Sequence, residues 1–109
     1  MAKEIRIPYE GKEYVLTFTR RIVSLMEQDG FNLAEVENKP ATMFPQLFAG
    51  AFRAKQPFVK PEIVDSIYKR ISDKSGLFEK LSDMYAEVVE ALFDEPEADE
   101  GNIQWKASW

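Results

Sequence analysis

The side chains that could do chemistry in this sequence are mostly carboxylates and hydroxyls. The 109 residues include 19 Asp and Glu but no His and no Cys, so the commonest general base and the best thiol nucleophile are missing. No serine lies in a Gly-x-Ser-x-Gly elbow, and the five glycines form no phosphate-binding loop. Zinc sites also lack both of their favoured ligand types. We therefore expect a protein that is not an enzyme and uses no metal or cofactor.

The carboxylates alone leave two possibilities, an acid pair or a cation site. A glycosidase-like pair needs two carboxyl groups on either side of a substrate, whereas these acids fall on expected helix surfaces or near the C-terminus, where charged side chains are usually solvated. The C-terminal acids do not follow the spacing of an EF-hand loop. They are Asp94, Glu95, Glu97, Asp99 and Glu100. We interpret both sets as solvated surface.

The net charge of −5 is unevenly distributed along the chain. Residues 1–93 carry 13 basic and 14 acidic side chains, whereas residues 94–109 carry five acids and one base, Lys106. Nucleic-acid binding needs a basic surface that neutralises phosphates, and no apolar run approaches the roughly 20 residues that span a bilayer. We therefore expect neither nucleic acid nor membrane as a partner. The lack of cysteine favours a cytoplasmic protein.

Recognition of another protein is the chemistry that remains, and two groups of large apolar residues are candidates for it. Aromatic anchors are typical of protein interfaces. One group recurs at helical spacing in the middle of the chain, and the other follows the acidic stretch. The first group is Met43, Phe44, Leu47, Phe48 and Phe52, and the second is Ile103, Trp105 and Trp109. We predict that both groups bind protein.

Each group also has a second interpretation. Aromatic residues at helical spacing more often belong to a core. The C-terminal residues could fold back onto the domain or lack structure. As a tethered peptide they would suit docking onto a partner, including strand addition to a sheet edge. The apolar seam from Phe78 to Leu92 likewise suits either intramolecular packing or helix pairing in a homo-oligomer.

The elements that position these residues begin with a β-hairpin over residues 3–18. Apolar residues alternate with polar ones on both sides of the turn Glu10-Gly11-Lys12, which is a good hairpin signal. One face of this hairpin is apolar. A lone two-stranded hairpin is not stable in water, so we expect helices to cover that face.

Four helices are predicted after the hairpin from apolar residues at steps of three and four. Thr19 and Thr42 are expected N-caps, with Pro45 in the first turn of the second helix. The helices span about 19–29, 42–55, 61–72 and 76–94. Residues 1–93 thus form a single α+β domain with the hairpin packed against the helices. Residues 94–109 are expected to be a flexible, acidic, Trp-bearing tail.

This layout resembles the small tail assembly chaperones of long-tailed (siphovirus-type) bacteriophages and prophages. The likeness covers most of the chain and is one of layout, with no catalytic-type motif. It lies in the hairpin from Ile5 to Thr19, the helix from Arg20 to Met26, the proline-containing aromatic helix at 42–55, the helix start Lys60-Pro61-Glu62, and the acidic tail with its Trp residues.

The resemblance implies a non-enzymatic role in phage morphogenesis. Proteins of this kind bind the tape-measure protein, keep it soluble and help recruit tail-tube subunits in the cytoplasm of the bacterial host, and they are not expected in the mature virion. Two other functions stay open. One is a structural virion component, such as a tail-completion or head–tail joining protein. The other is an acidic regulator that mimics DNA, which fits less well because the excess acids lie in the tail.

Overall fold

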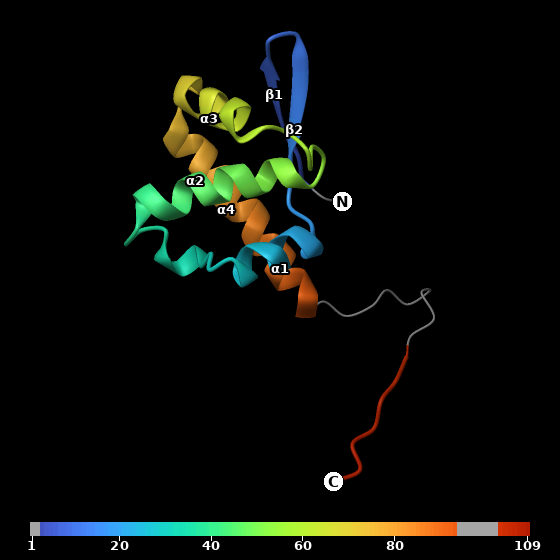
Figure 1. Cartoon of the computed structure of the whole chain (residues 1–109). Helices are drawn as coiled ribbons and strands as arrows, with labels where there is room; N and C mark the ends of the chain where they lie inside the picture. The colour runs from blue at the N-terminus through green and yellow to red at the C-terminus, as the bar shows by residue number, and fades with distance from the viewer. Residues whose placement is uncertain (1–2, 94–102) are drawn as a thin grey trace.

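The computed structural model of the chain describes residues 3–93 and 103–109 and has an α+β architecture (Figure 1). An antiparallel two-stranded hairpin at the N-terminus is followed by four α-helices, which confirms the predicted fold class. The predicted flexible acidic tail falls largely on residues 94–102, which lie outside the described residues. Residues 103–109 contain no helix or strand.

The hairpin pairs β1 (Ile5–Tyr9) with β2 (Lys12–Leu16) along their full lengths. The turn consists of Glu10 and Gly11, with φ angles of 48° and 81°. Two residues with positive φ form the turn type whose twist matches the twist of the strands. Glycine suits the second position because it has no Cβ.

One face of the hairpin packs against the helices, as predicted. Tyr14 and Leu16 on β2 are buried, and Leu16 has no exposed surface. Directly after β2, the Thr17 N–H donates a hydrogen bond of 3.0 Å to the carbonyl oxygen of Ala51. The opposite face of the hairpin carries Arg6, Pro8, Glu13 and Val15. Arg6 and Glu13 form an exposed ion pair there, 2.8 Å apart.

The first helix, α1 (Arg20–Gln28), begins where the sequence predicts. The Thr19 side chain accepts a hydrogen bond of 3.2 Å from the Ile22 N–H, and this satisfies one of the free donors of the first turn. Gly30, at a φ of 96°, follows the helix end. The residues between α1 and the second helix contain a 3₁₀ turn at Leu33–Glu35.

The second helix, α2 (Pro40–Arg53), starts two residues before the predicted start. Thr42 is therefore inside the helix and not its N-cap, a role that Lys39 takes without a side-chain hydrogen bond. Pro40 occupies the first turn, where a missing N–H is tolerated. Pro45 consequently lies inside the helix. The predicted start of α2 is wrong because Pro40, and not Pro45, lies in its first turn.

The last two helices are α3 (Pro61–Arg70) and α4 (Lys74–Glu90), and a 3₁₀ turn, Ala91–Phe93, follows α4. Both α-helices end before their predicted ends. The fourth also begins earlier, because the Asp73 carboxylate accepts a hydrogen bond of 3.2 Å from the Gly76 N–H. An N-cap of this kind stabilises a helix start, so the helix begins two residues before the predicted start at 76.

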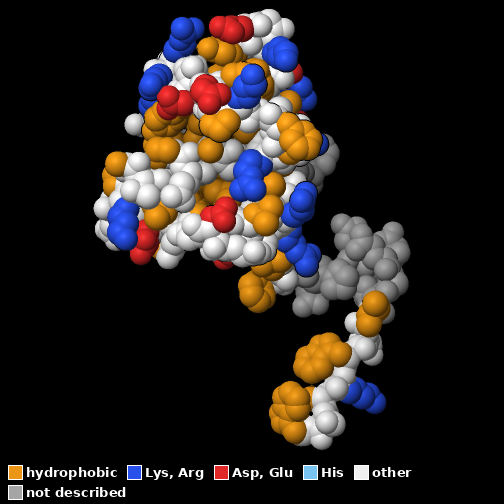
Figure 2. All heavy atoms as spheres, viewed as in Figure 1, with side chains coloured by type: hydrophobic (Ala, Val, Ile, Leu, Met, Phe, Trp, Pro, Cys, Tyr) orange, Lys and Arg blue, Asp and Glu red, His pale blue; other side chains and the backbone are white. Residues whose placement is uncertain are grey.

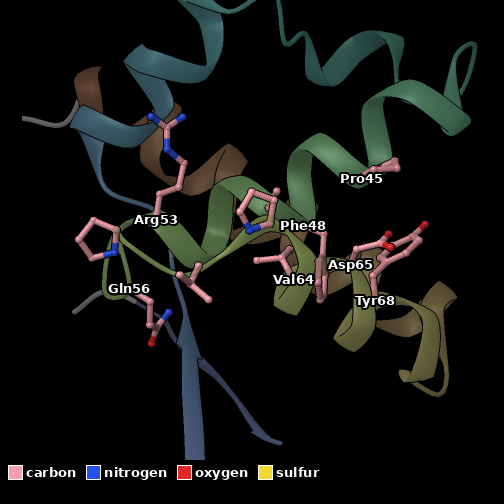
Figure 3. A pocket seen from close by; sticks show the side chains of 11 residues that line it. Pro45, Phe48, Arg53, Gln56, Val64, Asp65 and Tyr68 are labelled. Carbon is pink, nitrogen blue, oxygen red and sulfur yellow. The ribbon is translucent and has the colours of Figure 1, made fainter.

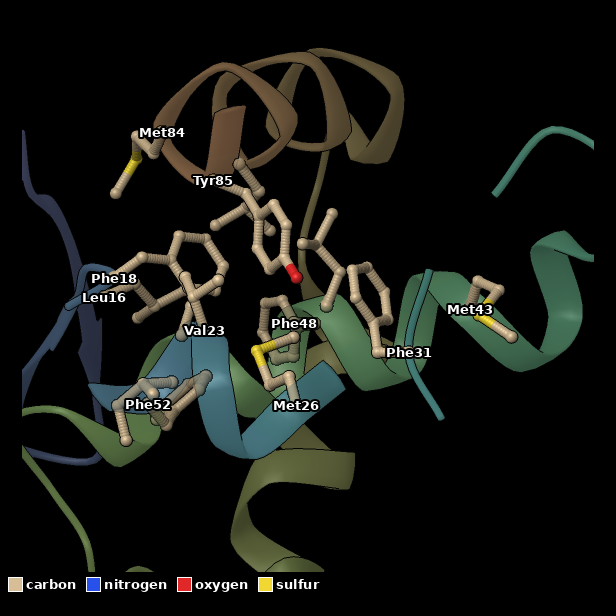
Figure 4. Close-up of a cluster of buried hydrophobic side chains, with 14 of the residues drawn as sticks. Leu16, Phe18, Val23, Met26, Phe31, Met43, Phe48, Phe52, Met84 and Tyr85 are labelled. Carbon is tan, nitrogen blue, oxygen red and sulfur yellow. The ribbon is translucent and has the colours of Figure 1, made fainter. Parts of the chain in front are cut away.

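Helix α2 lies at the centre of the fold and contacts β2 and all three other α-helices. Its inner face joins one core with residues of the hairpin and the other helices (Figure 4). The apolar seam from Phe78 to Leu92 packs largely inside this core, where Leu81 and Tyr85 are buried. Leu92, in the 3₁₀ turn after α4, is 51% exposed. Side chains with no exposed surface are Leu16, Leu47, Ala51, Phe52 and Leu81.

Candidate protein-binding site

A groove of about 430 Å³ opens between α2, α3 and the connecting residues 54–60 (Figure 3). This volume lies in the range of small-molecule and side-chain binding pockets. Its surface is mainly apolar, with a few polar groups. We call it the α2–α3 groove, and it is lined by Pro45, Phe48, Ala49, Arg53, Gln56, Pro57, Val59, Pro61, Val64, Asp65 and Tyr68.

The side chain of Gln56 holds the connecting residues in place. Its Nε2 donates hydrogen bonds to the carbonyl oxygens of Val15, at 2.9 Å, and Phe52, at 3.0 Å. Its Oε1 accepts a hydrogen bond of 2.9 Å from the Val15 N–H. The glutamine amide thus pairs with β2 as the backbone of a third strand would, and it satisfies strand groups at the outer edge. This contact fixes one end of the groove.

Aromatic rings form the floor of the groove. Phe48 is 1% exposed, and its ring centroid lies 5.3 Å from that of Tyr68 and 5.1 Å from that of Phe52. Tyr68 is also 5.5 Å from Phe44, edge to face. Ring pairs at these separations attract one another beyond their area burial. The floor is therefore a packed aromatic layer continuous with the core.

The charged residues that line the groove are Arg53 and Asp65, and Asp65 pairs with Lys69 at 3.1 Å. Further cations lie on the residues that connect α2 and α3. Residues 51–60 carry Arg53, Lys55 and Lys60 and no acidic residue, and all three of these side chains are exposed. Arg53 lies 3.8 Å from Asp29 in an exposed ion pair, which has little energetic weight. The Phe58 side chain in the same segment is 94% exposed. The connecting residues beside the groove therefore carry exposed cations and an exposed aromatic ring.

The structure places the predicted aromatic group of α2 mainly in the core. Met43, Leu47, Phe48 and Phe52 are buried, and the partly buried Phe44 packs 5.1 Å from Phe78. Most of this group thus belongs to the hydrophobic core, which is the second of the two interpretations given for it above. A partner would reach these side chains only if the fold opened, except where Phe48 meets the groove floor.

The C-terminal group has the opposite environment. Ile103, Trp105 and Trp109 are 93%, 81% and 100% exposed, and the hydrophobic side chains of residues 103–109 stand out as separate groups in Figure 2. In the structure these three side chains do not pack against the domain. Phe93 is a further exposed aromatic, at 85%, which sequence reasoning did not single out because it follows a helical apolar pattern.

Among the described residues, the pKa of one buried side chain is shifted. Burial, and secondarily the charge of Glu27, raises the pKa of the Tyr85 phenol. Among residues 3–93 and 103–109, no three acidic side chains are grouped closely enough to hold a metal ion. No helix within these ranges is long and apolar enough to cross a bilayer. The arrangement suits the docking of apolar side chains.

The fold and the groove together define a small α+β protein with an apolar groove between two helices. The chain matches a family model described as "Domain of unknown function (DUF5055)" over residues 1–109, and it therefore belongs to this family. No curated protein and no solved structure shows significant similarity to the chain.

Proposed function

We propose that this protein is a non-enzymatic assembly chaperone that binds the tape-measure protein of a long-tailed bacteriophage and helps recruit tail-tube subunits. The observation that carries the proposal is the exposure of Ile103, Trp105 and Trp109, which are 81–100% exposed. Exposed aromatic side chains can serve as anchors for a partner, because large rings contribute much of the binding energy at interfaces. The resemblance in layout supplies the identity of the partner.

The exposed aromatic side chains of this chain suit the surface expected of a tape-measure protein. A tape-measure protein is a long helical chain with apolar stripes that would aggregate if left exposed. Aromatic side chains on a short segment cover such stripes efficiently, because each ring buries a large apolar area. The five acids of residues 94–100 add negative charge to the complex, and net charge of one sign keeps proteins apart in solution.

The buried core residues of α2 are not assigned a direct role in partner binding. The aromatic stripe of α2 packs inside the fold, so we assign partner binding to the C-terminal residues and to the exposed groove. The complex forms in the cytoplasm of the bacterial host, and the chaperone leaves before the virion is complete.

Co-expression with the tape-measure protein of the same phage or prophage tests the proposal. We expect the wild-type chain to increase the soluble fraction of the tape-measure protein and to co-purify with it. The variant Trp105→Ala/Trp109→Ala should lose most of this effect, because truncated aromatic anchors commonly cost about 2 kcal/mol or more each. Lys106→Ala/Ser108→Ala is the matched control in the same segment and should behave as wild type.

Two results would contradict the proposal. One is a tape-measure protein whose solubility is the same with and without this chain. The other is the presence of this chain in purified virions at a fixed stoichiometry, which would favour a structural virion component instead.

A further inference from the structure

The α2–α3 groove and residues 103–109 of the same chain have matching chemistry. The groove has flat proline rings in its walls and an aromatic floor formed by Phe48 and Tyr68. Residues 103–109 offer one branched aliphatic side chain and two indoles within seven positions. Flat apolar walls around an aromatic ring give many dispersion contacts, and an aromatic anchor in a pocket is the usual centre of a binding interface.

Charge complementarity points in the same direction. Arg53 lines the groove, and Lys55 and Lys60 are exposed on the residues next to it. The one acid in the lining, Asp65, already pairs with Lys69 at 3.1 Å. Residues 94–100 carry five acids without a base. An indole in the groove would bring the acids that precede it near these cations. The Arg53 guanidinium, which lies on the groove wall, could also stack on an indole face.

The groove of the same molecule is not where these side chains lie. Trp105 and Trp109 are 81% and 100% exposed, so the chain presents a free anchor and an open groove at the same time. A molecule with two complementary surfaces that do not meet within it can bind a second copy of itself head to tail.

We propose that the α2–α3 groove binds residues 103–109 of a second copy of this chain, with an indole as the anchor in the groove. The contact is head to tail, because the first copy keeps its own anchor free and the second keeps its own groove free. This proposal does not depend on the tape-measure protein, since it involves only this chain. It implies that self-association and the binding of another protein through the same Trp residues compete.

The natural fluorescence of the chain provides the test, because its only two Trp residues lie in the proposed anchor segment. The emission of the full-length protein would be recorded across a dilution series, with sedimentation velocity on the same samples. We expect the emission maximum to move to shorter wavelength as concentration rises, in step with the larger species. An emission maximum independent of concentration while the protein stays monomeric would overturn the proposal.

Pro45→Glu is the sharpest groove variant, because Pro45 lines the groove and is exposed on α2. Proline is unfavourable inside a helix, so its replacement should not unfold the protein. The new carboxylate would face the incoming apolar anchor, and we expect self-association to weaken at least about tenfold. Gln46→Glu is the matched control, since Gln46 is exposed beside it but does not line the groove.

A second pair of variants tests the charge argument. Lys55→Glu/Lys60→Glu reverses two cations near the groove, and Lys12→Glu/Lys80→Glu makes the same change in net charge on other exposed positions. We expect only the first pair to weaken self-association, and added salt to weaken the wild-type contact. Equal effects of the two pairs would contradict the charge argument.

Two further outcomes would overturn the proposal. If Pro45→Glu leaves the concentration-dependent shift unchanged, the anchor occupies another surface. If the emission is already shifted at the lowest concentration and Pro45→Glu abolishes that shift, the anchor occupies the groove of its own chain and not that of a second copy.

Discussion

Helix α2 and residues 103–109 are both rich in large apolar side chains, but the structure buries them to opposite extents. Phe48 and Phe52 on α2 are at most 1% exposed, whereas Trp105 and Trp109 are 81% and 100% exposed. The helix contacts β2 and all three other α-helices, so most of its large apolar side chains are buried. Residue type alone therefore does not separate buried from exposed apolar segments in this chain, whereas the packing of each segment does.

The comparison also shows how the two regions are connected. Phe48 belongs both to the core and to the floor of the α2–α3 groove, so the outermost layer of the core forms the base of the candidate binding site. The proposed anchor segment therefore does not have to fold by itself, because the groove that it would bind has a floor formed by the core.

The largest effect is expected from Phe48→Ala. Removing a fully buried ring leaves a cavity beneath the groove, and the free energy of unfolding should fall by about 3–5 kcal/mol, out of a total of about 5–15 kcal/mol for a typical domain. Urea unfolding followed by circular dichroism measures this change. Phe58→Ala is the matched control, because Phe58 is 94% exposed, and it should change stability by less than about 0.5 kcal/mol. Equal losses in the two variants would remove the distinction between core and surface rings.

Gln56→Leu should have the next largest effect. The leucine cannot bond to Val15, so the backbone N–H and carbonyl of Val15 lose their side-chain partner, and the free energy of unfolding should fall by about 1–3 kcal/mol. Gln46→Leu makes the same change on the exposed face of α2 and should cost much less. Thermal unfolding of both variants measures the difference. A Gln56→Leu protein as stable as Gln46→Leu would mean that the amide does not hold the groove end.

High pH should lower the stability of the core by a smaller amount. Burial raises the pKa of Tyr85 above its ordinary value of 10.0. Below pH 10.0 the phenol is protonated in both states, so it does not change the free energy of unfolding. As the pH rises past 10.0, the unfolded state releases the proton first, and the free energy of unfolding falls until the pH reaches the pKa of the folded state. Tyr85→Phe should decline less between about pH 9 and about pH 11. Melting temperatures at several pH values would show this, and identical slopes for both proteins would contradict it.

The smallest effect on stability is expected from Trp105→Ala/Trp109→Ala. Both side chains are exposed, so their removal should change the free energy of unfolding by less than about 0.5 kcal/mol. Urea unfolding followed by circular dichroism measures this, because the variant has no Trp signal. A large loss would show that these residues pack on the domain after all.

Much of the fold follows from local patterns in the sequence. The alternation around Glu10-Gly11 predicts the hairpin, and Thr19 marks the start of α1, because a strand period and an N-cap are local signals. The start of α2 was wrong because Pro40 and Pro45 both fit a helix start. The start of α4 was missed because the Asp73 cap adopts a φ of 52°, which no apolar period reveals.

The candidate site was harder to predict than the fold. The sequence singled out Ile103, Trp105 and Trp109 as a group, because they stand apart from any helical pattern, and their role in binding stays a prediction. The groove was not, because it depends on Gln56 reaching Val15 across 41 positions, and on which face of α2 meets the core. Pairings of this kind are set by tertiary packing and leave no periodic trace in the sequence.

The most direct test of the two-region account is the Trp emission of the dilute native protein compared with the same protein in urea. Both Trp residues lie in residues 103–109, so the signal reports only on that region while circular dichroism reports the unfolding of the domain. The account predicts the same solvent-exposed emission maximum in both states. A native maximum clearly at shorter wavelength, lost together with the helical signal, would show that the anchor is part of the folded domain and would contradict the account.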